Sequence, residues 1–173
     1  HGYHGDTIGA MSVGYVPRYF SVYRPLLRRV TRLPSPAQNL SGRVVKLDEI
    51  LEETESYLKR ISTTTCALVM ESGAQIAGGV RIFPQGYQKK IAELSNTYGI
   101  LLILDEIATG FGRLGSMIEY LKQDSIPDIV CFGKSLTAGY TPLAVTLTSS
   151  EIFQSFLDRR SKFYHGHTFC GHP

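Results

Sequence analysis

The sequence lacks long apolar runs, carries little net charge and does not begin like a secreted protein. No stretch of about 18 apolar residues is present, so it does not predict a membrane-spanning helix. Residues 1–6, His-Gly-Tyr-His-Gly-Asp, do not resemble a signal peptide. The net charge of +3 over 173 residues is too small and too scattered for a nucleic-acid-binding surface. We therefore expect an ordinary globular protein with neither a membrane nor a nucleic acid as its partner.

Cysteines are few, and their positions do not predict a disulfide framework. There are three, an odd number with no tight spacing. Cys66 and Cys131 lie in apolar runs, which is typical of buried thiols. This pattern favours a reducing compartment, so we expect a cytoplasmic location. The chain has no initiating Met and stops at Pro173, which indicates a segment of a larger protein.

Apolar runs alternate with segments of helical periodicity along most of the chain. Four runs are continuous rather than alternating, which is typical of strands buried on both faces: 66–70, 100–104, 129–132 and 143–147. Helices are expected over 7–13 (capped by Asp6), 47–61, 84–98, 116–122 and 151–157, and irregular structure over 17–37. This alternation predicts an α/β fold with a mostly parallel sheet and flanking helices.

Polar side chains follow three of the predicted strands. They are Glu71, Asp105 and Lys134. Ligands of parallel sheets gather beyond the carboxyl ends of the strands. The sequence therefore predicts a functional site at this edge of the sheet.

Asp105 and Lys134 together suit the cofactor pyridoxal 5′-phosphate (PLP). A lysine half-buried at a strand end has a lowered pKa, which leaves more of its amine free to attack a carbonyl. PLP needs such a lysine and also an acid near its pyridine nitrogen. Taken singly, Asp105 could equally be a loop-capping aspartate, and Lys134 a surface side chain that extends its amine into water.

Two further motifs suggest competing interpretations. The glycines of segment 110–115 have the spacing of a dinucleotide-binding turn, but Asp105–Thr109 separate them from the strand, and two acids beside a pyrophosphate are unfavourable. Segment 165–172 contains three histidines and a cysteine, which are plausible zinc ligands. These ligands are crowded and no second ligand cluster is evident, so we expect no metal site.

Longer segments resemble the class III branch of the fold-type I PLP-dependent aminotransferases. They are 105–115 (Asp-Glu-Ile-Ala-Thr-Gly-Phe-Gly-Arg-Leu-Gly), 127–129 (Pro-Asp-Ile) and 133–137 (Gly-Lys-Ser-Leu-Thr). The resemblance implies that residues 1–173 are the central part of the large PLP-binding domain. It also implies that an N-terminal segment and a C-terminal small domain are absent from this chain, and that the isolated fragment is inactive.

Within this family, segments 3–13, 139–144 and 165–168 resemble the branch that acts in biotin synthesis. That branch transfers an amino group to 8-amino-7-oxononanoate and forms 7,8-diaminononanoate. Its usual donor is S-adenosylmethionine, although some members use lysine. The alternatives are another class III ω-aminotransferase, or a non-catalytic fragment of such an enzyme.

The resemblance also assigns roles at the cofactor. Lys134 corresponds to the Schiff-base lysine, and Asp105 to the acid that pairs with the pyridine nitrogen. Ile107 corresponds to the aliphatic residue beneath the cofactor ring.

The remaining roles concern the substrate and a second subunit. Tyr3 corresponds to the aromatic residue that stacks on the other ring face and borders the substrate; core packing is the alternative for this tyrosine. Thr168, with His167 beside it, corresponds to a cofactor-phosphate contact made with the neighbouring subunit of a homodimer. Gly166 then lies where the backbone approaches the substrate.

Overall fold

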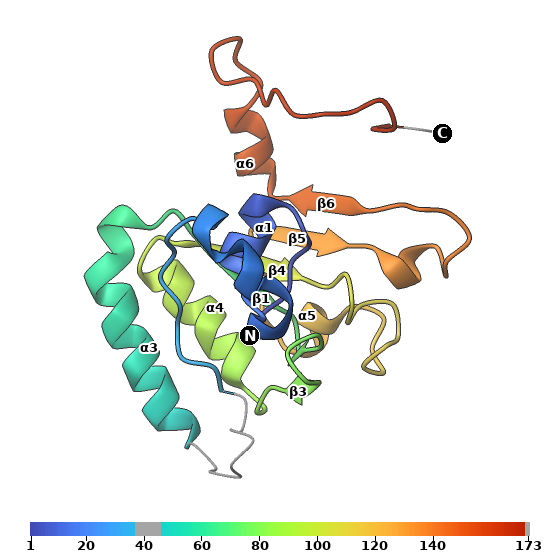
Figure 1. Cartoon of the computed structure of the whole chain (residues 1–173). Helices are drawn as coiled ribbons and strands as arrows, with labels where there is room; N and C mark the ends of the chain where they lie inside the picture. Colours follow the sequence, from blue (N-terminus) through green and yellow to red (C-terminus); the bar gives the residue numbers. More distant parts are fainter. Residues whose placement is uncertain (37–45, 172–173) are drawn as a thin grey trace.

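The computed structural model describes residues 1–36 and 46–171. In this part of the chain, one sheet has the strand order β1-β4-β5-β6, and a small antiparallel pair stands apart from it (Figure 1). The sheet strands are β1 (Ala67–Glu71), β4 (Leu101–Asp105), β5 (Ile129–Phe132) and β6 (Val145–Thr148); the pair is β2 (Ala74–Gln75) and β3 (Arg81–Ile82). The predicted α/β fold is confirmed.

Strand direction decides which residues meet at the end of the sheet. β4 is parallel to both of its neighbours, with Asp105 opposite Glu71 on β1 and opposite Cys131 on β5. β6 runs antiparallel to β5, with Val145 opposite Phe132. β1, β4 and β5 therefore finish at the same edge, as the alternating pattern predicts. β6 differs from the prediction because most of its residues are exposed.

Each of the five predicted helices is present, all but the one over 47–61 with different ends, and α2 is an additional one. They are α1 (Ile8–Val13), α3 (Leu47–Ile61), α4 (Tyr87–Thr97), α5 (Glu119–Lys122) and α6 (Ser150–Ser155), with the short α2 (Pro17–Phe20) and the 3₁₀ segments η1 (Ser21–Leu26), η2 (Ser62–Thr64) and η3 (Lys134–Leu136) among the described residues. The expected irregular structure over 17–37 is wrong in its first half, because Pro17 occupies the first turn of α2, where proline is tolerated. Residue 37 lies outside the described residues.

Three helix ends differ from prediction for identifiable reasons. α1 is capped by Thr7, whose Oγ1 accepts from the Ala10 N–H at 3.4 Å, whereas Asp6 accepts from the Tyr3 hydroxyl. α4 begins after Gly86, which has φ 83°, and not at Pro84. α5 is shorter than 116–122 because the preceding residues form a closed turn, with the Phe111 N–H on the Met117 carbonyl at 2.7 Å.

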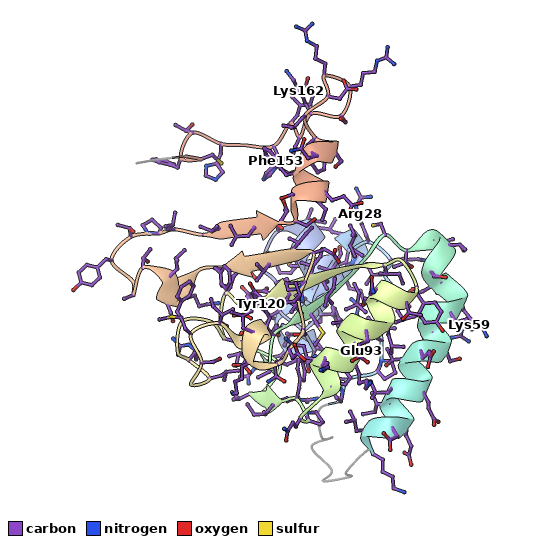
Figure 2. The ribbon with its side chains drawn as sticks, turned by 180° about the vertical axis from the view of Figure 1, so that it is seen from behind. Arg28, Lys59, Glu93, Tyr120, Phe153 and Lys162 are labelled. Carbon is purple, nitrogen blue, oxygen red and sulfur yellow. The ribbon has the colours of Figure 1, made fainter. Side chains whose placement is uncertain are left out.

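The main core lies between the sheet and two helices. α4 packs on β4 and α3 packs on α4 (Figure 1). Leu102 and Leu104 of β4 meet Ile91 of α4 and Ile50 of α3, and all four are nearly fully buried. Figure 2 shows the polar sides of these helices facing outward, with the exposed Lys59 and Glu93 labelled. Among the described residues, no helix is both long and apolar enough to cross a membrane.

The C-terminal arm, which we define as residues 156–171, stands off the sheet together with α6 (Figure 1). Every residue of the arm is exposed, including four large aromatic side chains: Phe156, Phe163, Tyr164 and Phe169. Contiguous exposed apolar side chains mark surfaces that contact another molecule. The arm therefore has the character of an interface rather than of a folded core.

The cysteines are more exposed than their apolar neighbours indicate. Cys66 is exposed and Cys131 is half-buried, so the expectation of buried thiols is wrong for Cys66. Cys66 directly precedes β1 and does not belong to it. Position at a strand end, and not the apolar run itself, decides its exposure.

Replacing Leu104 with Ala is expected to lower the free energy of unfolding by about 2–5 kcal/mol, because this side chain is completely buried between sheet and helix. Urea unfolding followed by circular dichroism measures the loss. Leu121→Ala is the control, since Leu121 is 58% exposed and should change the free energy of unfolding by only about 0.5 kcal/mol. Equal losses in both variants would contradict this description of the core.

Candidate active site

Asp105 ends β4 with both carboxylate oxygens held by the protein. Its residue is 7% exposed. Oδ1 accepts the Ile107 N–H at 2.9 Å, and Oδ2 lies 2.8 Å from His4 Nδ1. An aspartate so held cannot turn freely, so its carboxylate has one orientation at the edge of the sheet.

His4 is a site residue that the sequence reasoning missed. Its side chain is only 9% exposed and pairs with Asp105. The two residues lie 101 positions apart. Their spacing in the sequence therefore could not predict this contact. The one indication in the sequence is that His4 adjoins Tyr3 in segment 3–13, which resembles the family.

Glu71 lies beside Asp105 and holds the segment that carries His4. The carboxylate is buried, with Oε1 accepting the Tyr3 N–H at 3.1 Å and Oε2 accepting the Ile76 N–H at 2.8 Å. Burial raises the pKa of Glu71, and the two backbone donors only partly oppose that shift. The Tyr3 ring stacks on Phe20, with 5.8 Å between ring centroids.

Ile107 and Lys134 lie at the ends of the neighbouring strands β4 and β5. Gly133 makes their approach possible, because a Cβ atom there would lie 3.3 Å from Cγ2 of Ile107. The Ile107 side chain thus rests against the backbone directly before Lys134. The structure therefore brings Asp105 and Lys134 to adjoining strand ends, as the apolar runs predicted, with Ile107 near both.

Lys134 has an unusual backbone and an exposed side chain. Its φ is 43°, in the left-handed region that disfavours residues with a Cβ. Such strain costs of order 1–3 kcal/mol and clusters at functional sites. The prediction of a half-buried lysine is wrong for this chain, because η3 begins at Lys134 and turns its side chain toward solvent.

Glu106, next to Asp105, anchors the turn that follows β4. It is completely buried and accepts three hydrogen bonds: from Ser72 Oγ at 3.0 Å, the Glu119 N–H at 2.9 Å and the Tyr120 N–H at 2.6 Å. Burial raises the pKa of this carboxyl group, and the donors oppose the shift. The turn is thereby tied to the sheet at the point where Asp105 and Ile107 leave it.

The structure disagrees with the dinucleotide-binding interpretation of segment 110–115. Segment 110–115 is part of a turn, and α5 begins only at Glu119, so the glycines do not open a helix directly after a strand as a dinucleotide site requires. Across residues 1–36 and 46–171, no three His, Cys, Asp or Glu side chains gather as a metal site.

Three of the predicted residues lie on the C-terminal arm and not at this edge. Gly166, His167 and Thr168 are exposed on the C-terminal arm (Figure 1). The contacts of His167 are local, with Phe169 and Cys170. In the part of the chain that the structure describes, no hydrogen bond joins these residues to Asp105.

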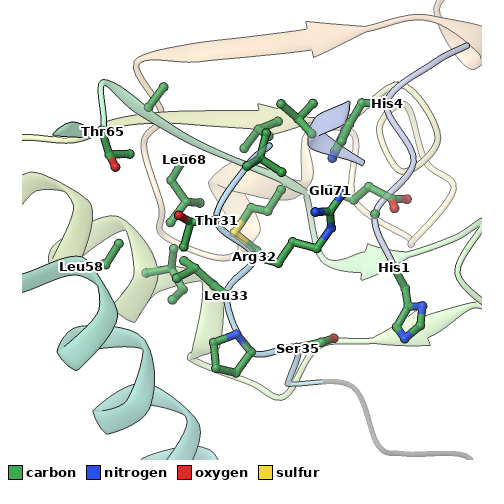
Figure 3. A pocket seen from close by; sticks show the side chains of 18 of the residues that line it. His1, His4, Thr31, Arg32, Leu33, Ser35, Leu58, Thr65, Leu68 and Glu71 are labelled. Atoms are coloured by element: carbon green, nitrogen blue, oxygen red, sulfur yellow. The ribbon is translucent and has the colours of Figure 1, made fainter. Parts of the chain in front are cut away.

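A pocket of about 560 Å³ runs along β1, on the side away from β4 (Figure 3). His4 and Glu71 are at one end of it, and Leu58 is at the other. Residues 29–36 form the opposite wall. Asp105 and Lys134 are not among its lining residues, so the candidate site is the edge of the sheet and only borders this pocket.

Comparison with known proteins agrees with the fold and the motifs. Residues 1–173 match the family described as Aminotransferase class-III. The adenosylmethionine-8-amino-7-oxononanoate aminotransferase of Aquifex aeolicus is 42% identical over 178 residues, which cover 98% of this chain and 39% of that protein. The chain therefore spans well under half the length of the curated relatives that it matches.

Two solved structures are similar to this one. The adenosylmethionine-8-amino-7-oxononanoate aminotransferase of Methanocaldococcus jannaschii superposes with a TM-score of 0.84 at 38% identity, over 97% of this chain and 38% of that one. A thermostable (S)-enantioselective omega-transaminase from Thermomicrobium roseum gives a TM-score of 0.85 at 37% identity, with the same coverage.

The buried Glu106 predicts a pH dependence of stability. Its folded pKa lies above the ordinary value of 4.5, so protonation favours the folded state. Its contribution to the free energy of unfolding is therefore greatest below about pH 4.5 and is lost as the pH rises through the raised folded pKa. Urea unfolding of wild type and Glu106→Gln across this range measures the effect, because other groups cancel in the difference. A difference between the two proteins that does not change with pH would contradict the raised pKa.

Proposed function

Since the chain belongs to the class III aminotransferases, we propose that it is the central part of the large PLP-binding domain of an 8-amino-7-oxononanoate aminotransferase. The N-terminal segment and the C-terminal small domain of that enzyme are absent from this chain, which agrees with its 39% coverage of the Aquifex aeolicus relative. The observation that carries the proposal is Asp105, held through both oxygens at the end of β4, beside the strained Lys134 at the end of β5.

The described residues fit PLP at its ring and its aldehyde. A carboxylate has about four lone-pair positions, so Asp105 can still accept a proton donor after bonding to His4 and to the Ile107 N–H. The exposed amine of Lys134 is accessible to an aldehyde. Ile107 offers an apolar surface between these two groups.

The residues of the chain then have distinct roles. When bound, PLP withdraws electrons from the amine-bearing carbon of the substrate. Asp105, held by His4, keeps a proton on the ring nitrogen. Lys134 would hold the cofactor through Nζ, and the free Nζ amine would accept the proton from the amine-bearing carbon of the donor. Tyr3, whose hydroxyl is bound to Asp6, borders the substrate.

The substrates are small molecules, an amino donor and a keto acceptor. We assign 8-amino-7-oxononanoate as acceptor and S-adenosylmethionine as donor, because the names of three curated relatives describe this pair. A cytoplasmic location is part of the proposal, and the three free cysteines support it. The second candidate is another ω-aminotransferase, which the equally similar Thermomicrobium roseum structure favours.

We further assign a homodimer in which Gly166, His167 and Thr168 contact the active site of the neighbouring subunit. The exposure of these residues and the exposed aromatic side chains of the C-terminal arm support it. Thr168 can offer both its hydroxyl and its backbone N–H to the cofactor phosphate.

The function is tested with the complete enzyme that contains this segment. Amino transfer to 8-amino-7-oxononanoate should be rapid with S-adenosylmethionine, and Lys134→Ala should lower the rate by about 10³-fold or more, because both attachment and proton transfer are lost. Borohydride should fix the cofactor onto Lys134, as mass spectrometry of the peptide detects. If the amino group is transferred from lysine and not from S-adenosylmethionine, the assigned donor is wrong. Activity only between other ω-amines and keto acids would favour the second candidate, and a borohydride adduct retained in Lys134→Ala would contradict the site.

Subunit complementation tests the dimer. Lys134→Ala and Thr168→Ala each damage both sites of a homodimer. A heterodimer of the two variants has one site with both residues intact only if Thr168 acts across the interface, and about half of wild-type activity is then expected. Co-expression with two affinity tags isolates this heterodimer. If Thr168 serves its own subunit, activity stays no higher than in the two homodimers.

A further inference from the structure

Two buried carboxylates lie side by side at the end of the sheet, and only one faces the proposed cofactor. Parallel pairing places Glu71 opposite Asp105. Asp105 bonds to His4 and to the following turn, whereas Glu71 bonds to two backbone N–H groups from different segments. Glu71 therefore has a separate task from that of Asp105.

The bonds of Glu71 require a carboxylate. One oxygen accepts the Tyr3 N–H and the other accepts the Ile76 N–H, so the side chain joins the N-terminal segment to the loop after β1. Glutamine has a single acceptor oxygen and would turn its NH₂ group against one of these donors. At a residue that is 4% exposed, water cannot easily replace the lost acceptor.

The anchored N–H lies next to the histidine that holds Asp105. His4 directly follows Tyr3, so a fixed Tyr3 N–H restricts the backbone from which the His4 ring reaches Asp105 Oδ2 at 2.8 Å. Figure 3 shows His4 and Glu71 together at one end of the pocket beside β1. That pocket leaves space into which an unanchored segment can move.

We propose that Glu71 is a positioning residue, which clamps the Tyr3–His4 backbone so that the His4 ring stays on Asp105. The effect of this clamp on cofactor binding rests on the proposed function, in which Asp105 faces the ring nitrogen of PLP. The clamp itself is a property of the chain without cofactor. It acts through His4 and requires no contact between Glu71 and substrate or cofactor.

The accessibility of His4 to diethyl pyrocarbonate tests the clamp in the cofactor-free complete enzyme. Glu71→Gln should increase the rate of modification at His4 by about fivefold to tenfold, the factor expected for loss of one hydrogen bond. N-acetylhistidine added to the same reaction serves as the reference and should react at an unchanged rate. Mass spectrometry of the peptides locates each modification.

Glu119→Gln is the matched control. Glu119 is 1% exposed and accepts hydrogen bonds from Ser116 and Gln123, but none from the Tyr3–His4 segment. This variant should leave the rate at His4 unchanged. Glu71→Asp, which keeps both oxygens on a shorter side chain, should give an intermediate rate and serves if Glu71→Gln does not fold. Thermal unfolding of all variants identifies any general loss of structure.

PLP titration separates the clamp from the proposed function. Weaker PLP binding in Glu71→Gln, together with a more reactive His4, supports both. A more reactive His4 in a protein whose wild type binds no PLP supports the clamp and contradicts the proposed function. An unchanged His4 rate in Glu71→Gln and Glu71→Asp overturns the clamp, whatever the PLP titration shows.

Discussion

Parallel pairing of β4 with both of its neighbours is the constraint on which the candidate site depends. Because β1, β4 and β5 run in the same direction, their carboxyl ends reach one edge of the sheet. Glu71 and Asp105 end β1 and β4, and Lys134 comes shortly after β5, so all three lie at this edge. Ligands gather at such edges because backbone and side chains diverge there into loops. If β5 ran antiparallel to β4, its carboxyl end and Lys134 would lie at the opposite edge from Asp105.

Buried carboxylates give this edge its rigidity at a cost in desolvation. Glu71 is paired with Asp105 across the sheet, and Glu106 follows Asp105 in the sequence. Each of the two glutamates accepts hydrogen bonds from two backbone N–H groups. Burial raises the pKa of both, so their charged forms are stabilised less than in water. In return, the segment with His4 and the turn after Ile107 are held in place.

The C-terminal arm, in contrast to the edge of the sheet, is exposed along its whole length. From 156 to 171 the chain has no buried residue, although it carries aromatic side chains that a folded core would normally contain. The proposed homodimer would account for both facts, since a second subunit would cover those side chains. The edge of the sheet and the arm would then be two halves of one site, contributed by different subunits.

The sequence by itself determined the α/β fold, the strands β1, β4 and β5, and the candidates Asp105, Ile107 and Lys134. Continuous apolar runs and the polar residues that follow them are local properties, so they are readable from neighbouring residues. Only the tertiary structure decided that His4 meets Asp105, that Glu71 holds the Tyr3 N–H and that Lys134 is exposed. These features depend on the path of the chain between positions as much as 101 residues apart, on which local pattern carries no information. The roles of Tyr3, Gly166, His167 and Thr168 stay predictions, because a second subunit and the cofactor, and not this chain alone, would bring them to the site.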